Sequence, residues 1–174
     1  MVKNVVWATV FALIAGILQS TLFSRLAILV SRVTIYYAVP DLALGILVYS
    51  AYVNGTMTGQ LTGFFSGFFL DFLSAAPLGL NAFVRTLVGA AVGLMNGSFF
   101  LDSFLLPMTL CAGATLIKAA LFFVLHLLFS GAIPTYSLFE PTLWVELLLN
   151  TLSAPFLFGL LKLFNNLLTG KRKS

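Results

Sequence analysis

Few side chains in this chain can form ion pairs or bind charged ligands, and several of them lie inside strongly apolar segments. Asp71 and Arg85 lie in two consecutive apolar segments, and Glu146 lies in a later one. A carboxylate and a guanidinium in such surroundings can form a bidentate ion pair or bind a polar ligand. Pairing is favoured because an isolated charge at the centre of a membrane costs about 2.5–3.5 kcal/mol on insertion scales.

No arrangement of residues typical of catalysis is present in the sequence. The single histidine and the single cysteine, Cys111, lack the neighbours that a nucleophilic site or a metal site requires. Phosphate-binding loops and nucleotide fingerprints are also missing from the sequence. We therefore expect a protein that is not an enzyme, with no catalytic residue, no metal site and no cofactor.

Glycines recur at every fourth position in the two segments that carry Asp71 and Arg85. They form one series before the acid and one after the base: Gly59, Gly63 and Gly67, then Gly89, Gly93 and Gly97. Positions four apart advance by about 40° around a helix, so each series forms a slanted stripe. Because stripes of small residues let membrane helices approach closely, we expect these two helices to pack along them.

Asp71 and Arg85 are equally far from the turn that joins their segments. The turn Ala75–Gly79 lies between them, and antiparallel helices place residues equidistant from a turn at about the same depth. The spacing therefore predicts an intramembrane Asp71–Arg85 ion pair. Two roles remain open for the pair: a structural clamp that holds the two helices together, or part of a binding site for a ligand or partner.

Further polar residues are expected at the same side of the membrane as this pair. Together with it, Asp41, Asn81 and Glu146 could line an outward-facing polar pocket. Asp41 also stands at the start of an apolar segment, where an acidic side chain compensates the N-terminal end of a helix. Glu146 could instead pair with Lys118 of the preceding segment. A pocket for a lipid-linked precursor is a weaker alternative, since a single arginine committed to an acid is poorly placed to bind phosphate.

Composition places the chain in the class of integral membrane proteins. Of its 174 residues, 60% are hydrophobic and only 8% are charged, against about 25% charged residues in soluble domains. At about 20 residues per span, the length allows five or six helices in a single transmembrane domain, residues 1–174, and no separate soluble domain. The net charge of +4 is too small and too local for nucleic-acid binding, so the expected surroundings are the lipid bilayer.

The apolar segments predict an all-α fold with six membrane-spanning helices. They are Val5–Phe23, Pro40–Val53, Thr56–Ser74, Leu80–Phe100, Leu105–Phe129 and Pro141–Leu168. Lys3 and the basic tail Lys171–Lys173 favour the cytoplasm, and two cytoplasmic ends require an even number of spans. Arg25 and Arg32, in the interfacial connection after the first span, then fall on the outer side, against the same rule.

The first segment carries a further stripe of small residues, Ala8, Ala12 and Gly16. Packing within the chain explains such a stripe, and contact with a partner's helix is the alternative. The sequence leaves the oligomeric state open, with a homodimer among the options.

At several of these residues the chain resembles the bacterial rod shape-determining protein MreD family. The matching stretches are Pro40–Leu42, the run from Gly59 through Gly63 and Gly67 to Asp71, and Pro77–Ala82. The glycine run followed by a Pro-Leu-Gly turn is fairly specific. The stretch Gly16–Thr21 also resembles the family's first span, while the last two spans match only in general character.

The resemblance implies a multi-pass protein of the bacterial inner membrane, a non-enzymatic scaffold of the elongation machinery in peptidoglycan biogenesis. Such proteins bind MreC, a single-span protein, and act with MreB, RodA and a class B penicillin-binding protein. The family is also similar in fold to the substrate-binding S components of ECF vitamin transporters. An S component is therefore the alternative function, and the Ala8/Ala12 stripe is the sequence feature that favours it.

Overall fold

The structure is a computed structural model that describes residues 2–30, 39–74, 76–98, 104–129 and 140–168, with backbone alone over 22–30. In these residues the chain forms six helices of 13 residues or more and one short final helix. They are α1 (Val2–Val30), α2 (Leu42–Asn54), α3 (Thr56–Leu73), α4 (Leu80–Leu94), α5 (Leu105–Leu128), α6 (Pro141–Leu163) and α7 (Asn165–Leu168).

Each predicted span corresponds to one of the long helices, but several boundaries differ. Helix α1 continues to Val30, so the residues around Arg25 are helical and the expected interfacial connection begins later. Arg32 and the tail Lys171–Lys173 lie outside the described residues. Helix α4 ends at Leu94, earlier than expected, and α6 is interrupted at Phe164 before the short α7.

Within the described residues, three helical stretches are long and apolar enough to cross a membrane: Val2–Thr21 of α1, Leu105–Leu128 and Pro141–Leu163. The helices Leu42–Asn54 and Leu80–Leu94 are apolar but shorter. The chain is thus an all-helical membrane protein in its described part. That six helices cross the bilayer stays a prediction.

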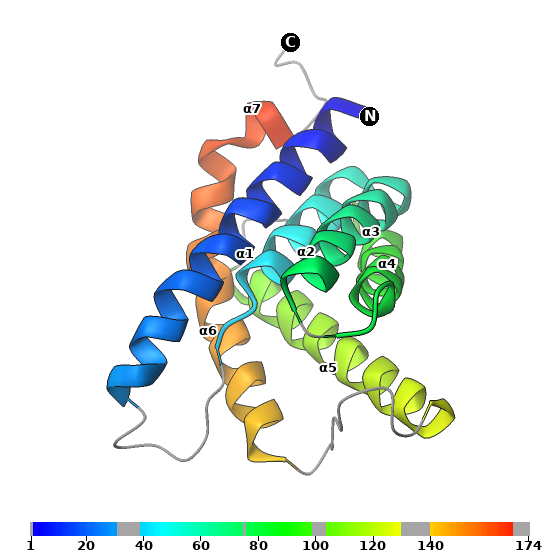
Figure 1. Ribbon diagram of the computed structural model, residues 1–174. Helices are drawn as coiled ribbons and strands as arrows, with labels where there is room; N and C mark the ends of the chain where they lie inside the picture. Colours follow the sequence, from blue (N-terminus) through cyan, green and yellow to red (C-terminus); the bar gives the residue numbers. More distant parts are fainter. Residues whose placement is uncertain (1, 31–38, 75, 99–103, 130–139, 169–174) are drawn as a thin grey trace.

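Helices α1 and α2 run antiparallel, as their cross-contacts show. Asn4 of α1 hydrogen-bonds Asn54 at the end of α2, whereas Gln19, farther along α1, reaches Leu42 at the start of α2. The side chain of Asn54 also donates to the carbonyl of Leu168. The first turn of α1, the end of α2 and helix α7 therefore meet at one end of the bundle (Figure 1).

Helix α2 is the centre of the bundle. It contacts α1, α3, α4, α5 and α6, and every residue from Ala43 to Tyr52 is buried (Figure 1). A helix that is apolar all round is typical of a protein core or of a membrane span, and α2 is covered by the other helices. With 13 residues, α2 is roughly 20 Å long, so it extends through only part of a hydrocarbon core about 30 Å thick.

A single residue, Gly55, joins α2 to α3. Its φ of 88° lies in a region that other L-residues rarely adopt, so this abrupt turn requires glycine. The turn folds α3 back along α2, and a Cβ placed on Gly59 would overlap the side chain of Ala51.

Helices α3 and α4 approach each other closely along the two glycine stripes. A Cβ on Gly59 would overlap the backbone of Gly89, and a Cβ on Gly63 would overlap the backbone of Arg85. The same holds between Gly67 and the backbone of Asn81. Each glycine therefore stands directly against the opposing main chain, as close membrane packing requires.

The ends of the second stripe differ from each other. Gly93 lies against the backbone of Thr56 and belongs to the contact. Gly97 does not, because α4 has ended at Leu94 and Gly97 adopts a φ of 74° in the following turn, with open space where a Cβ would be. The prediction that Gly97 extends the packing stripe is therefore wrong.

The small-residue stripe of α1 faces the interior of the protein. Ala8 and Ala12 are buried in the main hydrophobic core, whereas a Cβ on Gly16 would meet nothing within 4 Å. Packing within the chain, the first of the two interpretations, therefore holds for Ala8 and Ala12. The alternative, a face for a partner's helix, is wrong for these two residues, because helices of the same chain already cover them.

Candidate functional site

The candidate site is a cluster of charges around the start of α2. Asp41 is the N-cap residue of this helix, and its carboxylate accepts a hydrogen bond of 2.9 Å from the backbone N–H of Leu44. Aspartate is favoured here because its oxygen satisfies an N–H group that has no partner within the helix. Helix-end compensation, one of the two roles considered for Asp41, is thus part of its function in the fold.

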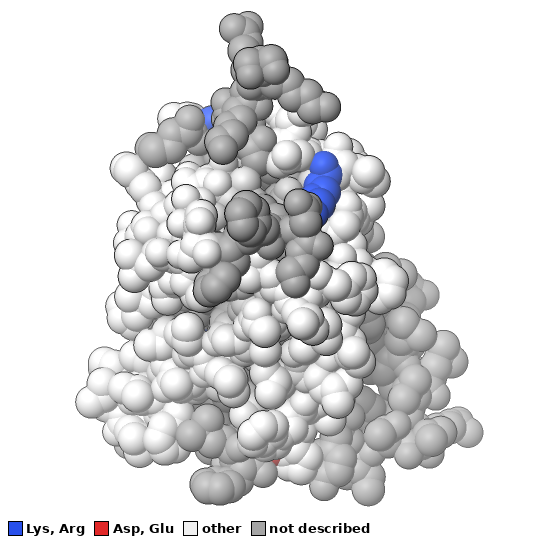
Figure 2. All heavy atoms as spheres, turned by 180° about the vertical axis from the view of Figure 1, so that it is seen from behind, with Lys and Arg blue, Asp and Glu red and all other residues white. Residues whose placement is uncertain are grey.

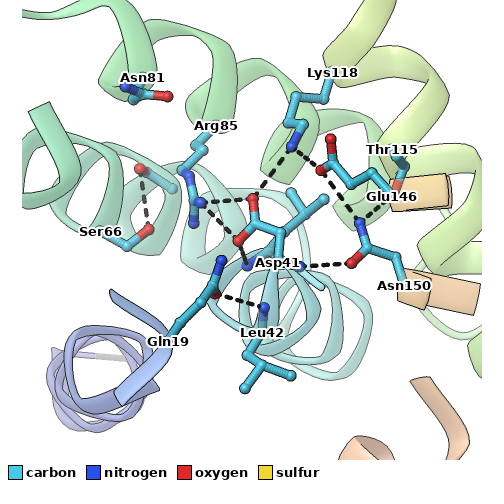
Figure 3. A network of polar contacts seen from close by, with 12 residues as sticks. Gln19, Asp41, Leu42, Ser66, Asn81, Arg85, Thr115, Lys118, Glu146 and Asn150 are labelled. Carbon is cyan, nitrogen blue, oxygen red and sulfur yellow. Dashed lines mark hydrogen bonds and ion pairs between the residues drawn. The ribbon is translucent and has the colours of Figure 1, made fainter. Parts of the chain in front are cut away.

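Two cations from other helices also bind the Asp41 carboxylate (Figure 3). Nη2 of Arg85, on α4, lies 2.8 Å from both carboxylate oxygens. Nζ of Lys118, on α5, lies 3.3 Å from one of them. One aspartate thus holds α2, α4 and α5 together through charge-assisted hydrogen bonds, which are stronger than neutral ones.

Lys118 continues the cluster into α6, where it forms an ion pair with Glu146. The sequence left two roles open for Glu146, and this pair is the alternative to a role in a polar pocket. On the same helix, Asn150 accepts a 2.6 Å hydrogen bond from the backbone N–H of Asp41 and donates one of 3.0 Å to Thr115 of α5. The polar contacts therefore tie the two long helices α5 and α6 to the beginning of α2.

Helix α1 completes the ring around the start of α2. The side-chain oxygen of Gln19 accepts a hydrogen bond of 3.1 Å from the backbone N–H of Leu42. The first turn of α2 is thus capped by a side chain of its own and by side chains from two other helices, α1 and α6 (Figure 3).

The cluster is buried, balanced in charge and level with the middle of α5. The four ionic side chains Asp41, Arg85, Lys118 and Glu146 are only 3–12% exposed. Two acids and two bases leave no net charge, as expected where bringing an unpaired ion out of water would cost several kcal/mol. Lys118 lies near the middle of α5, so we expect the cluster to lie deep in the bilayer rather than at its surface.

The predicted ion pair between Asp71 and Arg85 is wrong. Asp71 instead caps the start of α4, where its carboxylate accepts hydrogen bonds of 2.9–3.2 Å from the backbone N–H groups of Gly79, Asn81 and Ala82. The side-chain amide of Asn81 donates a fourth bond of 2.9 Å. These donors occupy the carboxylate fully, and Arg85 reaches inward to Asp41.

Of the three residues predicted to line a polar pocket with the ion pair, Asp41 and Glu146 come together and Asn81 does not; that they form a pocket stays a prediction. Lys118 brings Asp41 and Glu146 together, but Asn81 belongs to the separate cap of α4, and Figure 3 shows it apart from the network. Sequence reasoning missed Asn150 and Gln19 as members of the cluster. Their residue type could have indicated it. Both are amides inside apolar helices, where an amide without a hydrogen-bond partner is costly.

Asp71→Ala is expected to lower the free energy of unfolding by about 1–3 kcal/mol, because it leaves four hydrogen-bond donors of the α3–α4 turn without their acceptor. Asp71→Asn retains one acceptor oxygen and is expected to recover part of this loss. Thermal unfolding in mild detergent measures the effect. Ser74→Ala, at an exposed position after α3, is the control, and an equal loss there would contradict the capping role.

Comparison with known families decides what kind of protein this is. A family model described as "rod shape-determining protein MreD" matches residues 2–164. The chain belongs to the MreD family. The match includes all six long helices and every residue of the cluster around Asp41. Neither a curated protein nor a solved structure was found to match the sequence.

Family membership and the apolar helices together establish a rod shape-determining membrane protein. In this MreD-family chain, the buried charges link the start of α2 to α4 and α5, and Lys118 of α5 to Glu146 of α6. Each of the four ionic side chains of the cluster is paired with an opposite charge, so the cluster carries no unpaired charge. Its clearest chemical consequence is to hold the helices in one arrangement.

Proposed function

We propose that this protein is a non-enzymatic subunit of the bacterial cell-elongation machinery that binds MreC in the cytoplasmic membrane. Through MreC it acts with MreB, RodA and a class B penicillin-binding protein to organise peptidoglycan synthesis. The observation that carries the proposal is the family match over residues 2–164. The helical architecture supports it, because the buried polar groups serve to fix the positions of helices.

We further propose that both ends of the chain lie in the cytoplasm. The start of α1 and helix α7 meet at the same end of the bundle, which fits an even number of crossings. Lys3 and Lys162 are exposed toward the two ends of the chain. On the face shown in Figure 2, basic atoms of the described residues appear near the upper end. Their position at this end fits the preference of basic residues for the cytoplasmic side.

MreC, as a single-span protein, would bind on the outer, lipid-facing surface of the bundle. The small residues Ala8 and Ala12 are already covered within the chain. The outer faces present large apolar side chains instead, such as Ile14 and Ile17 on α1 and Phe156 on α6. Large side chains at a helix–helix contact in lipid act through shape complementarity, because lipid tails are equally apolar.

Co-purification tests the proposal directly. The tagged protein is extracted from cells with a mild detergent at near-native expression, and MreC is expected in the eluate, whereas an unrelated single-span membrane protein is not. A well-folded, monodisperse protein that recovers no MreC would contradict the proposal.

Because Cys111 is the only cysteine and is buried, Cys111→Ser gives a cysteine-free background. Single cysteines introduced at the exposed positions Ile14, Phe68 or Phe156 can then be crosslinked to MreC. Crosslinks between two copies would reveal a homodimer.

The alternative function, a vitamin-binding S component, now rests on weaker support. Its favourable sequence feature was the Ala8/Ala12 stripe, and both alanines are buried inside the protein. This alternative predicts that a vitamin raises the unfolding temperature of the purified protein. A panel of vitamins that leaves the temperature unchanged would exclude it.

A further inference from the structure

A small cavity adjoins the charged cluster on the side of α2 that faces α5 and α6. Its wall includes Asp41 and Gly45 of α2, Cys111 of α5, and Asn150 and Ser153 of α6. The cavity has a volume of about 10 Å³, which is close to the space that one water molecule requires. Cavities of this size stay empty when their walls are apolar. Leu44, Ala154 and Leu157 make part of this wall apolar, but Asp41, Asn150, Ser153 and Cys111 add polar groups to it.

The polar groups on the wall retain unused hydrogen-bonding capacity. The hydroxyl of Ser153 donates to the carbonyl of Asn150, which leaves its oxygen lone pairs available as acceptors. The amide oxygen of Asn150 accepts one bond, from the backbone of Asp41, and has a second lone pair. Cys111 adds a thiol hydrogen, a weak donor. A buried water typically makes about three hydrogen bonds, so this set matches one water.

Helix α6 contains a helix-interrupting residue beside the cavity. Pro155 lies inside the helix, next to Ala154 of the cavity wall. A proline lacks the N–H that would bond the carbonyl four residues earlier, and its ring pushes against that turn. Membrane helices tolerate proline because side chains and ordered waters satisfy the backbone groups that it frees.

We propose that this cavity is a binding site for a single water molecule that links Asn150 and Ser153 of α6 to Cys111 of α5 beside Asp41. The water adds a mobile dipole next to buried charges that would otherwise meet only protein groups. It lies in the interior of the bundle, at the start of α2.

The thiol of Cys111 reports on this water without any label, because it is the only cysteine in the chain. The protein is placed in lipid nanodiscs and transferred to heavy water, and infrared spectroscopy follows the loss of the S–H stretching band. We expect the band to vanish within minutes, while the most protected backbone amides keep their hydrogen far longer. Cys111→Ala removes the band and assigns it.

Two variants determine whether the exchange proceeds through the cavity. Ser153→Val fills the space and removes the hydroxyl, so S–H exchange is expected to slow about tenfold or more, since it must then await local opening. Thr151→Val, whose hydroxyl bonds the carbonyl of Leu147 away from the cavity wall, is the matched control and is expected to exchange like the parent. Ser153→Thr, which adds only a methyl group, gives a second measurement should the valine variant fold poorly.

Two outcomes would overturn the proposal. One is an S–H band in the parent protein that lasts as long as the most protected amides. The other is exchange in the filled variants that is as fast as in the parent.

Discussion

Asp41→Asn is expected to lower the free energy of unfolding by about 3–5 kcal/mol, the cost of removing one partner from a buried ionic contact. Asparagine is nearly the same size as aspartate and can still accept a hydrogen bond from Leu44. It cannot balance Arg85 and Lys118, which both lie within 3.3 Å of the carboxylate. The expected loss in unfolding free energy therefore measures the contribution of the charge of Asp41, separately from its size and its capping role.

The measurement is unfolding of the purified protein in mild detergent, with Glu140→Gln as the control. Glu140 is exposed just before α6 and makes no side-chain cap, so its change is expected to stay within about 0.5 kcal/mol. If Asp41→Asn were as mild as the control, the cluster would not hold the helices together. We also expect Asp41→Asn to reduce the amount of folded protein in cells, and with it any support of rod shape.

Gly63→Leu is expected to prevent the close approach of α3 and α4 and to yield little monodisperse protein. Even the first carbon of a side chain at this position would overlap the carbonyl of Arg85 and crowd the N–H of Thr86. Backbone atoms inside a helix cannot swing aside as a side chain can. Gly63→Ala should already cost about 1–3 kcal/mol through overpacking.

Gly159→Leu provides the matched control for this substitution. Gly159 is also a helical glycine, but it is exposed on α6 and a Cβ there would meet nothing within 4 Å. We expect this variant to elute from size-exclusion chromatography like the parent protein. Equal behaviour of the Gly63 and Gly159 variants would refute the close contact between α3 and α4.

The helices and one of their contacts could be predicted from the sequence because they depend on local patterns. Apolar segments separated by glycine and proline mark the long helices, although α1 and α4 end at other residues than expected. Positions four apart gave the register of the α3–α4 contact, since only glycine allows two backbones to meet at each of these places. Gly97 lies beyond the end of the helix, so the same pattern failed there.

The partners of the charges could not be predicted from spacing alone. Equal distance from a turn fixes the depth of Asp71 and Arg85 but not the direction of each side chain. The free N–H groups at the start of α4 lie nearer to Asp71 in the chain, and they bind its carboxylate. Arg85 then pairs with an acid 44 residues earlier, at the start of a short helix whose central position no local pattern reveals.

The pairing of Arg85 is the central claim, and a pair of double-mutant cycles tests it most directly. One cycle combines Asp41→Asn with Arg85→Gln, and the other combines Asp71→Asn with Arg85→Gln, each followed by unfolding in the same detergent. We predict a coupling energy of about 2 kcal/mol or more for Asp41 with Arg85, and about 0.5 kcal/mol or less for Asp71 with Arg85. Strong coupling of Arg85 to Asp71, with none to Asp41, would contradict the account.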